Sequence, residues 1–204
     1  MKTTDFGGET AYVLEDGGGA RAWVLPAVGN NCIAFQTTVD GQVVHLLSTP
    51  SSPDVLRQRP TFWGFPILSP YPGRHQTPFT WRGKRYEIVA NDRPGVAIHG
   101  IVAGAPWEVL SAAGAVLTCR FDSQRVTVGG ELPGTGQRRS DRGTWPWPFT
   151  LTTTHRVEDG ALYLEVELLN RSEEVIPHLL GLHPYFPLRF TPAGSTDEAP
   201  GGAG

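Results

Sequence analysis

The stretch FTLTTTHRVEDGALYLEVELL, residues 149–169, decides the fold of this chain. Over 161–169 apolar and polar side chains alternate, with Leu162, Leu164, Val166 and Leu168 on one face and Tyr163, Glu165 and Glu167 on the other. This period of two residues predicts a β-strand. Asp159-Gly160 before it is a strong turn signal, so residues 149–157 are predicted to pair with it in an antiparallel hairpin.

The same pattern recurs along the chain. A second hairpin is predicted from residues 32–39 and 42–47, joined through Asp40-Gly41. Further strands are expected over residues 11–14, 20–25, 86–89, 107–110, 116–121 and 126–128. Short strands at regular spacing, with turn residues between them, predict an all-β fold whose antiparallel sheets pack as a large β-sandwich.

Glycine and proline, with 25 and 18 residues, leave little room for long helices. One short helix is predicted, with Ser52 as N-cap, Pro53 at the first position and Asp54 favoured by the helix dipole, until Pro60 ends it. Residues 129–143 are predicted as a long exposed loop. Residues 191–204 are predicted as a disordered Gly- and Pro-rich tail, which leaves residues 1–190 as a partial sandwich domain.

The composition limits the classes of function. A net charge of -3 and a pI near 6.1 give no general attraction to nucleic acid or to anionic membranes, which favours a small, weakly charged ligand. The chain has no apolar run near the ~20 residues of a membrane helix and no visible signal peptide, so a cytoplasmic location is predicted. Cys32 and Cys119 are interpreted as buried, reduced thiols, with a disulfide as the open alternative.

The usual motifs of hydrolases, nucleotide enzymes and zinc proteins are missing from the sequence, so four other motifs are the candidates for chemistry. The first is GFPILSPYPGR, residues 64–74, which ends in Arg74. Its guanidinium can grip sugar hydroxyls or a carboxylate, but a rigid loop with a solvent-facing arginine explains the motif equally well. The second is Ile98-His99-Gly100, where a hydrogen-bonded structural histidine is the open alternative.

The third motif is WPWPF, residues 145–149, whose rings fit the apolar face of a pyranose but are better interpreted as core. The fourth is GLHPYF, residues 181–186. In it Pro184 keeps the chain extended next to His183, and two aromatic residues follow, so His183 is predicted to be fixed at a strand end. Imidazole titrates near physiological pH, so His183 can donate a proton to an ether oxygen and is the predicted catalytic group.

In this order the four motifs resemble those of the aldose 1-epimerase (galactose mutarotase-like) family, over about residues 11–190. The resemblance implies the large antiparallel supersandwich of that family. It implies interconversion of the α and β anomers of a free aldose, with a small sugar as partner and without cofactor or metal. By matching motifs, His183 would be the general acid, and Arg74 and His99 would contact the sugar.

The resemblance is incomplete at the C-terminal end. The family's general base, a glutamate, and a sugar-binding aspartate come from segments beyond the His-Pro-Tyr-Phe strand, where this chain has residues 187–190 and the tail. Asp197 and Glu198 lie in that tail with no motif around them, so neither role is assigned to them. We expect a truncated or frameshifted product, with a naturally short variant as the open alternative, and in either case unpaired strand edges and uncovered apolar surface.

Three alternatives stay open at this point. A non-catalytic carbohydrate-binding relic would keep Arg74 and His99. A metal-binding β-barrel of the cupin kind would use some of the six histidines, which are scattered at 45, 75, 99, 155, 178 and 183. A sugar-phosphate epimerase would meet the phosphate with Arg138, Arg139 and Arg142. No particular sugar and no oligomeric state is predicted.

Overall fold

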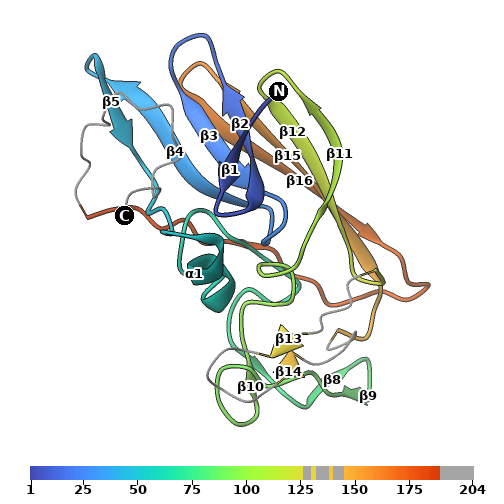
Figure 1. The fold of residues 1–204 in the computed structure, drawn as a ribbon. Coiled ribbons are helices and arrows are strands. Elements are labelled where there is room, and N and C mark those ends of the chain that lie inside the picture. The colour runs from blue at the N-terminus through green and yellow to red at the C-terminus, as the bar shows by residue number, and fades with distance from the viewer. Residues whose placement is uncertain (126–129, 132–137, 140–144, 189–204) are drawn as a thin grey trace.

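The computed structural model describes residues 1–125, 130–131, 138–139 and 145–188. In this part of the chain two main antiparallel sheets are accompanied by one short helix and several two-stranded pairs (Figure 1). The predicted all-β class is therefore confirmed.

The first sheet is a five-stranded meander in the order β1-β2-β3-β4-β5. Its strands are β1 (Lys2–Phe6), β2 (Glu9–Glu15), β3 (Arg21–Leu25), β4 (Asn31–Val39) and β5 (Gln42–His45). Asp40 and Gly41 join the last two strands with φ of 51° and 77°. Two left-handed residues in a row are what a type I′ hairpin turn requires, so the predicted Asp-Gly hairpin is confirmed.

The second sheet has the order β11-β12-β15-β16. Its strands are β11 (Glu108–Ala113), β12 (Val116–Asp122), β15 (Phe149–Glu158) and β16 (Ala161–Asn170). Asp159 and Gly160 connect β15 to β16 with φ of 50° and 77°, which confirms the hairpin predicted from residues 149–169. On β15, every second residue from Phe149 to Val157 is buried, which defines the inner face of this sheet.

The two sheets pack against each other as a sandwich. Leu14 and Val24 of the first sheet share one core cluster with Leu117, Phe121 and Leu151 of the second. Hydrogen bonds also tie the β15–β16 turn to the first sheet. Gly160 N donates to Asp16 Oδ2 at 2.7 Å, and Thr37 Oγ1 donates to Gly160 O at 2.7 Å.

Helix α1 (Pro53–Gln58) covers the other face of the first sheet. Ser52 Oγ accepts a hydrogen bond from Val55 N at 3.2 Å, which is the predicted N-cap, and Arg59 is the C-cap just before Pro60. Leu56 is fully buried in a second core cluster with Trp23 and Ile33. The predicted helix is thus confirmed.

Short strand pairs are formed by the chain between the two sheets and, in one case, by the segment that follows β16. β6 (Ile67–Leu68) pairs with β17 (Gly181–Leu182), β7 (His75–Gln76) with β10 (Val96–Ala97), and β8 (Phe79–Trp81) with β9 (Lys84–Tyr86). Figure 1 shows β8, β9 and β10 at one end of the sandwich, beyond α1. The β6–β17 pair brings the Pro-Ile-Leu motif and the His-Pro-Tyr-Phe motif together.

Several sequence predictions need correction. The strand predicted over 86–89 is wrong beyond Tyr86, because both backbone polar groups of Ile88 bond to the Thr77 hydroxyl at 2.8–2.9 Å instead of to a strand. β1, made of mostly polar residues, was not predicted. The predicted loop over 129–143 contains a short pair, β13 (Gly130–Glu131) and β14 (Arg138–Arg139).

Other predictions fall outside the described residues. These are the strand at 126–128, the rest of the predicted loop with Arg142, and the tail at 191–204; the side chains of Arg138 and Arg139 are likewise not described. Cys32 and Cys119 are buried and carry free thiols, as predicted. Burial raises the pKa of both thiols to about 12, so both are inert protonated core residues.

Candidate active site

His183 stands directly after β17, on a segment that pairs with the Pro-Ile-Leu motif. His183 N donates to Pro66 O at 3.1 Å, and Tyr185 N donates to Gly64 O at 2.9 Å. Gly181 is required here, because a β-carbon at this position would lie 2.4 Å from the Pro72 side chain. The backbone therefore fixes where the exposed His183 side chain begins.

His99 is placed by an unusual backbone turn. Its φ is +65°, and Gly100 follows with φ of +69°. A β-carbon on Gly100 would lie 1.9 Å from Ser69 O, and the next residue, Ile101, donates its N–H to the same oxygen at 2.8 Å. A left-handed histidine costs about 1–2 kcal/mol relative to ordinary backbone, and such strain gathers at functional sites.

The two histidines of the second and fourth motifs meet. The ring centroids of His99 and His183 are 5.7 Å apart and the rings are tilted by 60°. Tyr185 packs against His183, with the two ring centroids 5.0 Å apart. His99 Nδ1 shares a hydrogen bond of 3.1 Å with the buried hydroxyl of Thr61. Within the described residues, His99 Nε2 and both ring nitrogens of His183 have no hydrogen-bond partner.

The surroundings keep His99 neutral. Burial is the main cause that lowers the pKa of His99, followed by the positive charges of His183 and Arg74, while the charge of Asp92 raises it. A neutral imidazole can donate one hydrogen bond and accept another. His99 is therefore suited to bind a hydroxyl group at neutral pH.

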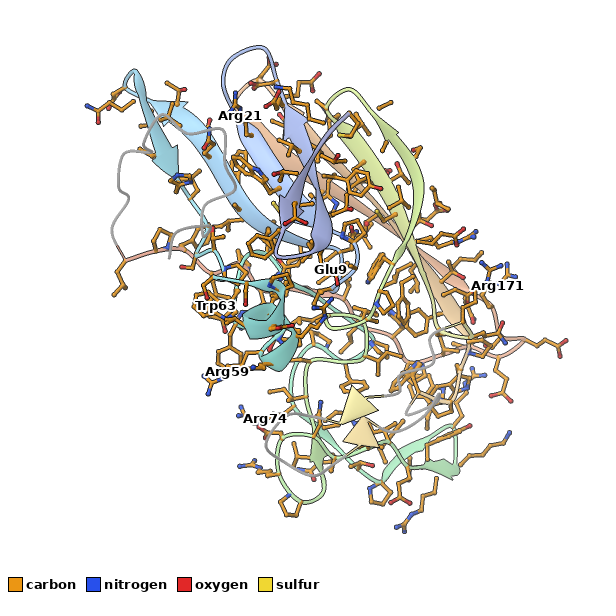
Figure 2. The ribbon with its side chains drawn as sticks, in the orientation of Figure 1. Glu9, Arg21, Arg59, Trp63, Arg74 and Arg171 are labelled. Atoms are coloured by element: carbon orange, nitrogen blue, oxygen red, sulfur yellow. The ribbon has the colours of Figure 1, made fainter. Side chains whose placement is uncertain are left out.

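Arg74 is near enough to His99 for its charge to lower the pKa of that histidine. The Arg74 side chain is 60% exposed, and its Nε donates to Asp92 Oδ2 at 2.9 Å. In Figure 2 the Arg74 side chain lies below Arg59, the C-cap of α1. Arg74 is both solvent-facing and ion-paired, so the structure does not decide between the two interpretations of the motif, and its contact with a sugar stays a prediction.

A third histidine, His178, is bonded to the segment on which Gly100 packs. His178 Nε2 and the Oγ of Ser69 share a hydrogen bond of 2.8 Å, and Ser69 is fully buried. Burial lowers the pKa of His178 to about 4, so this imidazole stays neutral. Since Ser69 also accepts from Ile101 through its carbonyl, this bond connects the backbone next to His99 with the segment that carries His183.

Sequence reasoning missed Thr61, Asp92 and the Ser69–His178 bond. Asp92 lies in Asn-Asp-Arg-Pro-Gly, an ordinary turn sequence, so no local pattern distinguished it. Trp145, Trp147 and Phe149 of the third motif are 6%, 4% and 0% exposed, which confirms their interpretation as core.

The described residues contain no cluster of metal ligands and no helix of membrane-spanning length. No three His, Cys, Asp or Glu side chains come close enough together to hold a metal ion, so the scattered histidines do not form the cluster of a cupin-type site. The one α-helix found there has six residues, too few to cross a membrane.

Fold and site together define a class: an antiparallel β-sandwich protein with a histidine pair and an ion-paired arginine at its surface. The model of the aldose 1-epimerase family matches residues 11–199. The chain therefore belongs to the aldose 1-epimerase family. This confirms the resemblance that the four motifs indicate.

Solved structures share the fold at low sequence identity. A galactose mutarotase-like protein from Clostridium acetobutylicum is 21% identical with a TM-score of 0.72, and the match covers 91% of this chain and 53% of that one. A GalM/aldose epimerase homologue from C. elegans is 18% identical with a TM-score of 0.66, over 87% and 50%. A galactose mutarotase-like protein from Lactobacillus casei is 18% identical with a TM-score of 0.59, over 86% and 49%. The chain thus spans about half the length of these structures.

Proposed function

We propose that this protein binds a free aldose at the histidine pair and takes part in interconverting its α and β anomers. The observation that carries the proposal is the 5.7 Å approach of the His99 and His183 rings, both with ring nitrogens open to a ligand. Arg74 stands in the same electrostatic environment and adds a fixed cation with hydrogen-bond donors. Membership of the aldose 1-epimerase family supports this chemistry.

In the proposed reaction, His183 donates a proton to the ring oxygen of the sugar. A base removes the proton of the anomeric hydroxyl, the bond between C1 and the ring oxygen breaks, and an aldehyde forms. Rotation about the C1–C2 bond and reclosure then give either anomer. His99, neutral and held by Thr61, and Arg74 bind hydroxyl groups and fix the ring beside His183.

Carbohydrate binding without turnover is the second candidate function. Among the described residues, Asp92 is the carboxylate whose charge acts on His99, and it is already ion-paired to Arg74. In the part of the chain that the structure describes, the carboxylate next to the histidines is thus already engaged by Arg74, and the proposal has a candidate acid in His183 but no unpaired carboxylate beside it as a base. This observation favours binding for the chain by itself.

Polarimetry of anomer interconversion tests the first candidate, with His183→Ala as the key variant. Loss of a general acid should lower the rate by about 10²–10⁴-fold. His45→Ala is the control, because His45 lies on β5 in the first sheet, outside the cluster. We expect its rate to equal that of the unmodified protein.

Calorimetric titration with glucose and galactose separates the two candidates. Binding with no rate above the spontaneous reaction supports the carbohydrate-binding function. Equal rates for the unmodified chain and His183→Ala, at measurable activity, contradict the proposed role of His183. An absence of binding to any aldose contradicts both candidates.

A further inference from the structure

The turn before His99 does not need the Asp92 side chain for its own folding. Asp92 N donates to Val96 O at 3.2 Å, and Val96 N donates to Arg93 O at 2.9 Å. The Asn91 side chain binds the backbone of Ile98 in both directions, at 2.7 and 3.1 Å. Because backbone groups and Asn91 hold the turn, the Asp92 carboxylate is available for another task.

That carboxylate lies between two arginines. Asp92 Oδ2 is 2.9 Å from Arg74 Nε and 3.9 Å from Arg93 Nε. The Asp92 side chain is 21% exposed, against 60% and 65% for the two arginines. Asp92 therefore binds Arg74 through Nε, the guanidinium nitrogen nearest the backbone. In the described part of the chain, its two terminal amino groups make no hydrogen bond, so both keep their donors for a ligand.

We infer that Asp92 is a positioning residue of the candidate site, whose carboxylate holds Arg74 by Nε so that the terminal amino groups meet a bound sugar. The inference rests on the proposed function, since it explains how the sugar-contacting arginine is held. The carboxylate has a second effect on the site. It opposes the lowering of the pKa of His99 that burial, His183 and Arg74 produce, while the Thr61 hydroxyl adds no charge there.

The test compares two isosteric variants. Asp92→Asn keeps the shape and removes the charge. Asp122→Asn is the matched control, because Asp122 is 24% exposed and pairs with Arg125 at 3.6 Å, on β12 in the second sheet. The measurements are hydrogen exchange of the Arg74 Nε proton by NMR, the NMR titration of the His99 imidazole, and calorimetric binding of an aldose.

In Asp92→Asn we expect faster exchange of the Arg74 Nε proton and a lower pKa for His99, because the charge that raises it is gone. Aldose affinity should fall by about two- to fivefold, the usual effect of an exposed ion pair. Asp122→Asn should change none of the three.

An Arg74 signal and a His99 titration that are both unchanged in Asp92→Asn overturn the inference, and so does an unchanged aldose affinity. If the unmodified chain binds no aldose, the proposed function fails. The exchange and titration measurements then still decide whether Asp92 holds Arg74.

Discussion

The first sheet and the segment from β16 to Leu188 contain similar apolar residues in different settings. In the first sheet Leu14, Trp23 and Ile33 are at most 1% exposed. In the later segment Leu168, Leu179 and Phe186 are 43%, 64% and 61% exposed. The first sheet is covered on one face by the second sheet and on the other by α1, whereas within the described residues β16 pairs with β15 alone.

Alternation in the sequence thus shows which face of a strand is apolar, but it does not show whether another layer covers that face. It also concerns function, because His183 belongs to the less covered segment. Hydrogen bonds of the backbone to Pro66 and Gly64, rather than close packing, hold that histidine. His99, by contrast, is half-buried after β10 and is held by its bond to Thr61 and by the close approach of Gly100 to Ser69.

The largest expected effect comes from truncating matched leucines in the two regions. Leu14→Ala should lower the free energy of unfolding by about 2–5 kcal/mol, because it leaves a cavity between the two sheets. Leu168→Ala removes a side chain that is 43% exposed, so we expect a loss below about 1 kcal/mol. Urea denaturation followed by circular dichroism measures both.

Equal losses for the two variants would contradict the comparison. They would show that Leu168 is covered in solution, by further chain or by a second molecule, as fully as Leu14 is covered by the second sheet. Sedimentation of the unmodified protein at several concentrations then separates these two causes.

Acid sensitivity gives the next largest effect. Burial lowers the pKa of His155, in the sandwich, and of His178, beside the site, from 6.5 to about 4. Between these values the unfolded chain binds protons that the folded chain does not. The free energy of unfolding is therefore highest above about pH 6.5. It falls as the pH drops toward 4, by about 1.4 kcal/mol per pH unit for each histidine.

Urea denaturation at pH 7.5, 6.5 and 5.5 measures this loss, and single variants divide it between the regions. His155→Gln and His178→Gln should each remove a large share of the pH dependence, and the remainder comes from His45 and His99, whose pKa burial also lowers. If His178→Gln leaves the dependence unchanged, the segment around the site does not unfold together with the sandwich.

Much of the fold follows from local patterns. Both Asp-Gly hairpins and the Ser52-capped helix could be predicted because the turn and the cap depend on residues that are neighbours in the sequence. β1 could not be predicted, since its polar residues pair with β2 through the backbone. The strand prediction beyond Tyr86 was wrong for a related reason, because the backbone of Ile88 forms its hydrogen bonds with the side chain of Thr77, which is distant in sequence.

The site follows the same rule. The motifs indicated His99, His183 and Arg74, and the structure brings them into one electrostatic cluster. Their supporting partners, Thr61 and Asp92, lie 38 and 18 residues away from the groups they bind. Such pairs arise from tertiary packing, so no spacing in the sequence marks them.

The smallest effect tests whether the site stores backbone strain. His99 has φ of +65°, where a β-carbon is unfavourable and glycine is not. His99→Gly should therefore be more stable than His99→Ala by about 1 kcal/mol, although both lose the imidazole. Asp40, with φ of 51° in the first sheet's hairpin, is the matched position. The free energy of unfolding of Asp40→Gly should exceed that of Asp40→Ala by a similar amount.

The outcome at these two positions decides what the left-handed histidine means. If the glycine variant is more stable than the alanine variant at both positions, the left-handed backbone at His99 is strained to the same degree as the one in the hairpin turn. An advantage at Asp40 alone would show that the backbone at His99 relaxes once the imidazole and its bond to Thr61 are gone. In that case the bond between Thr61 and His99 maintains the conformation, and Thr61→Val should lower aldose affinity as much as His99→Ala does.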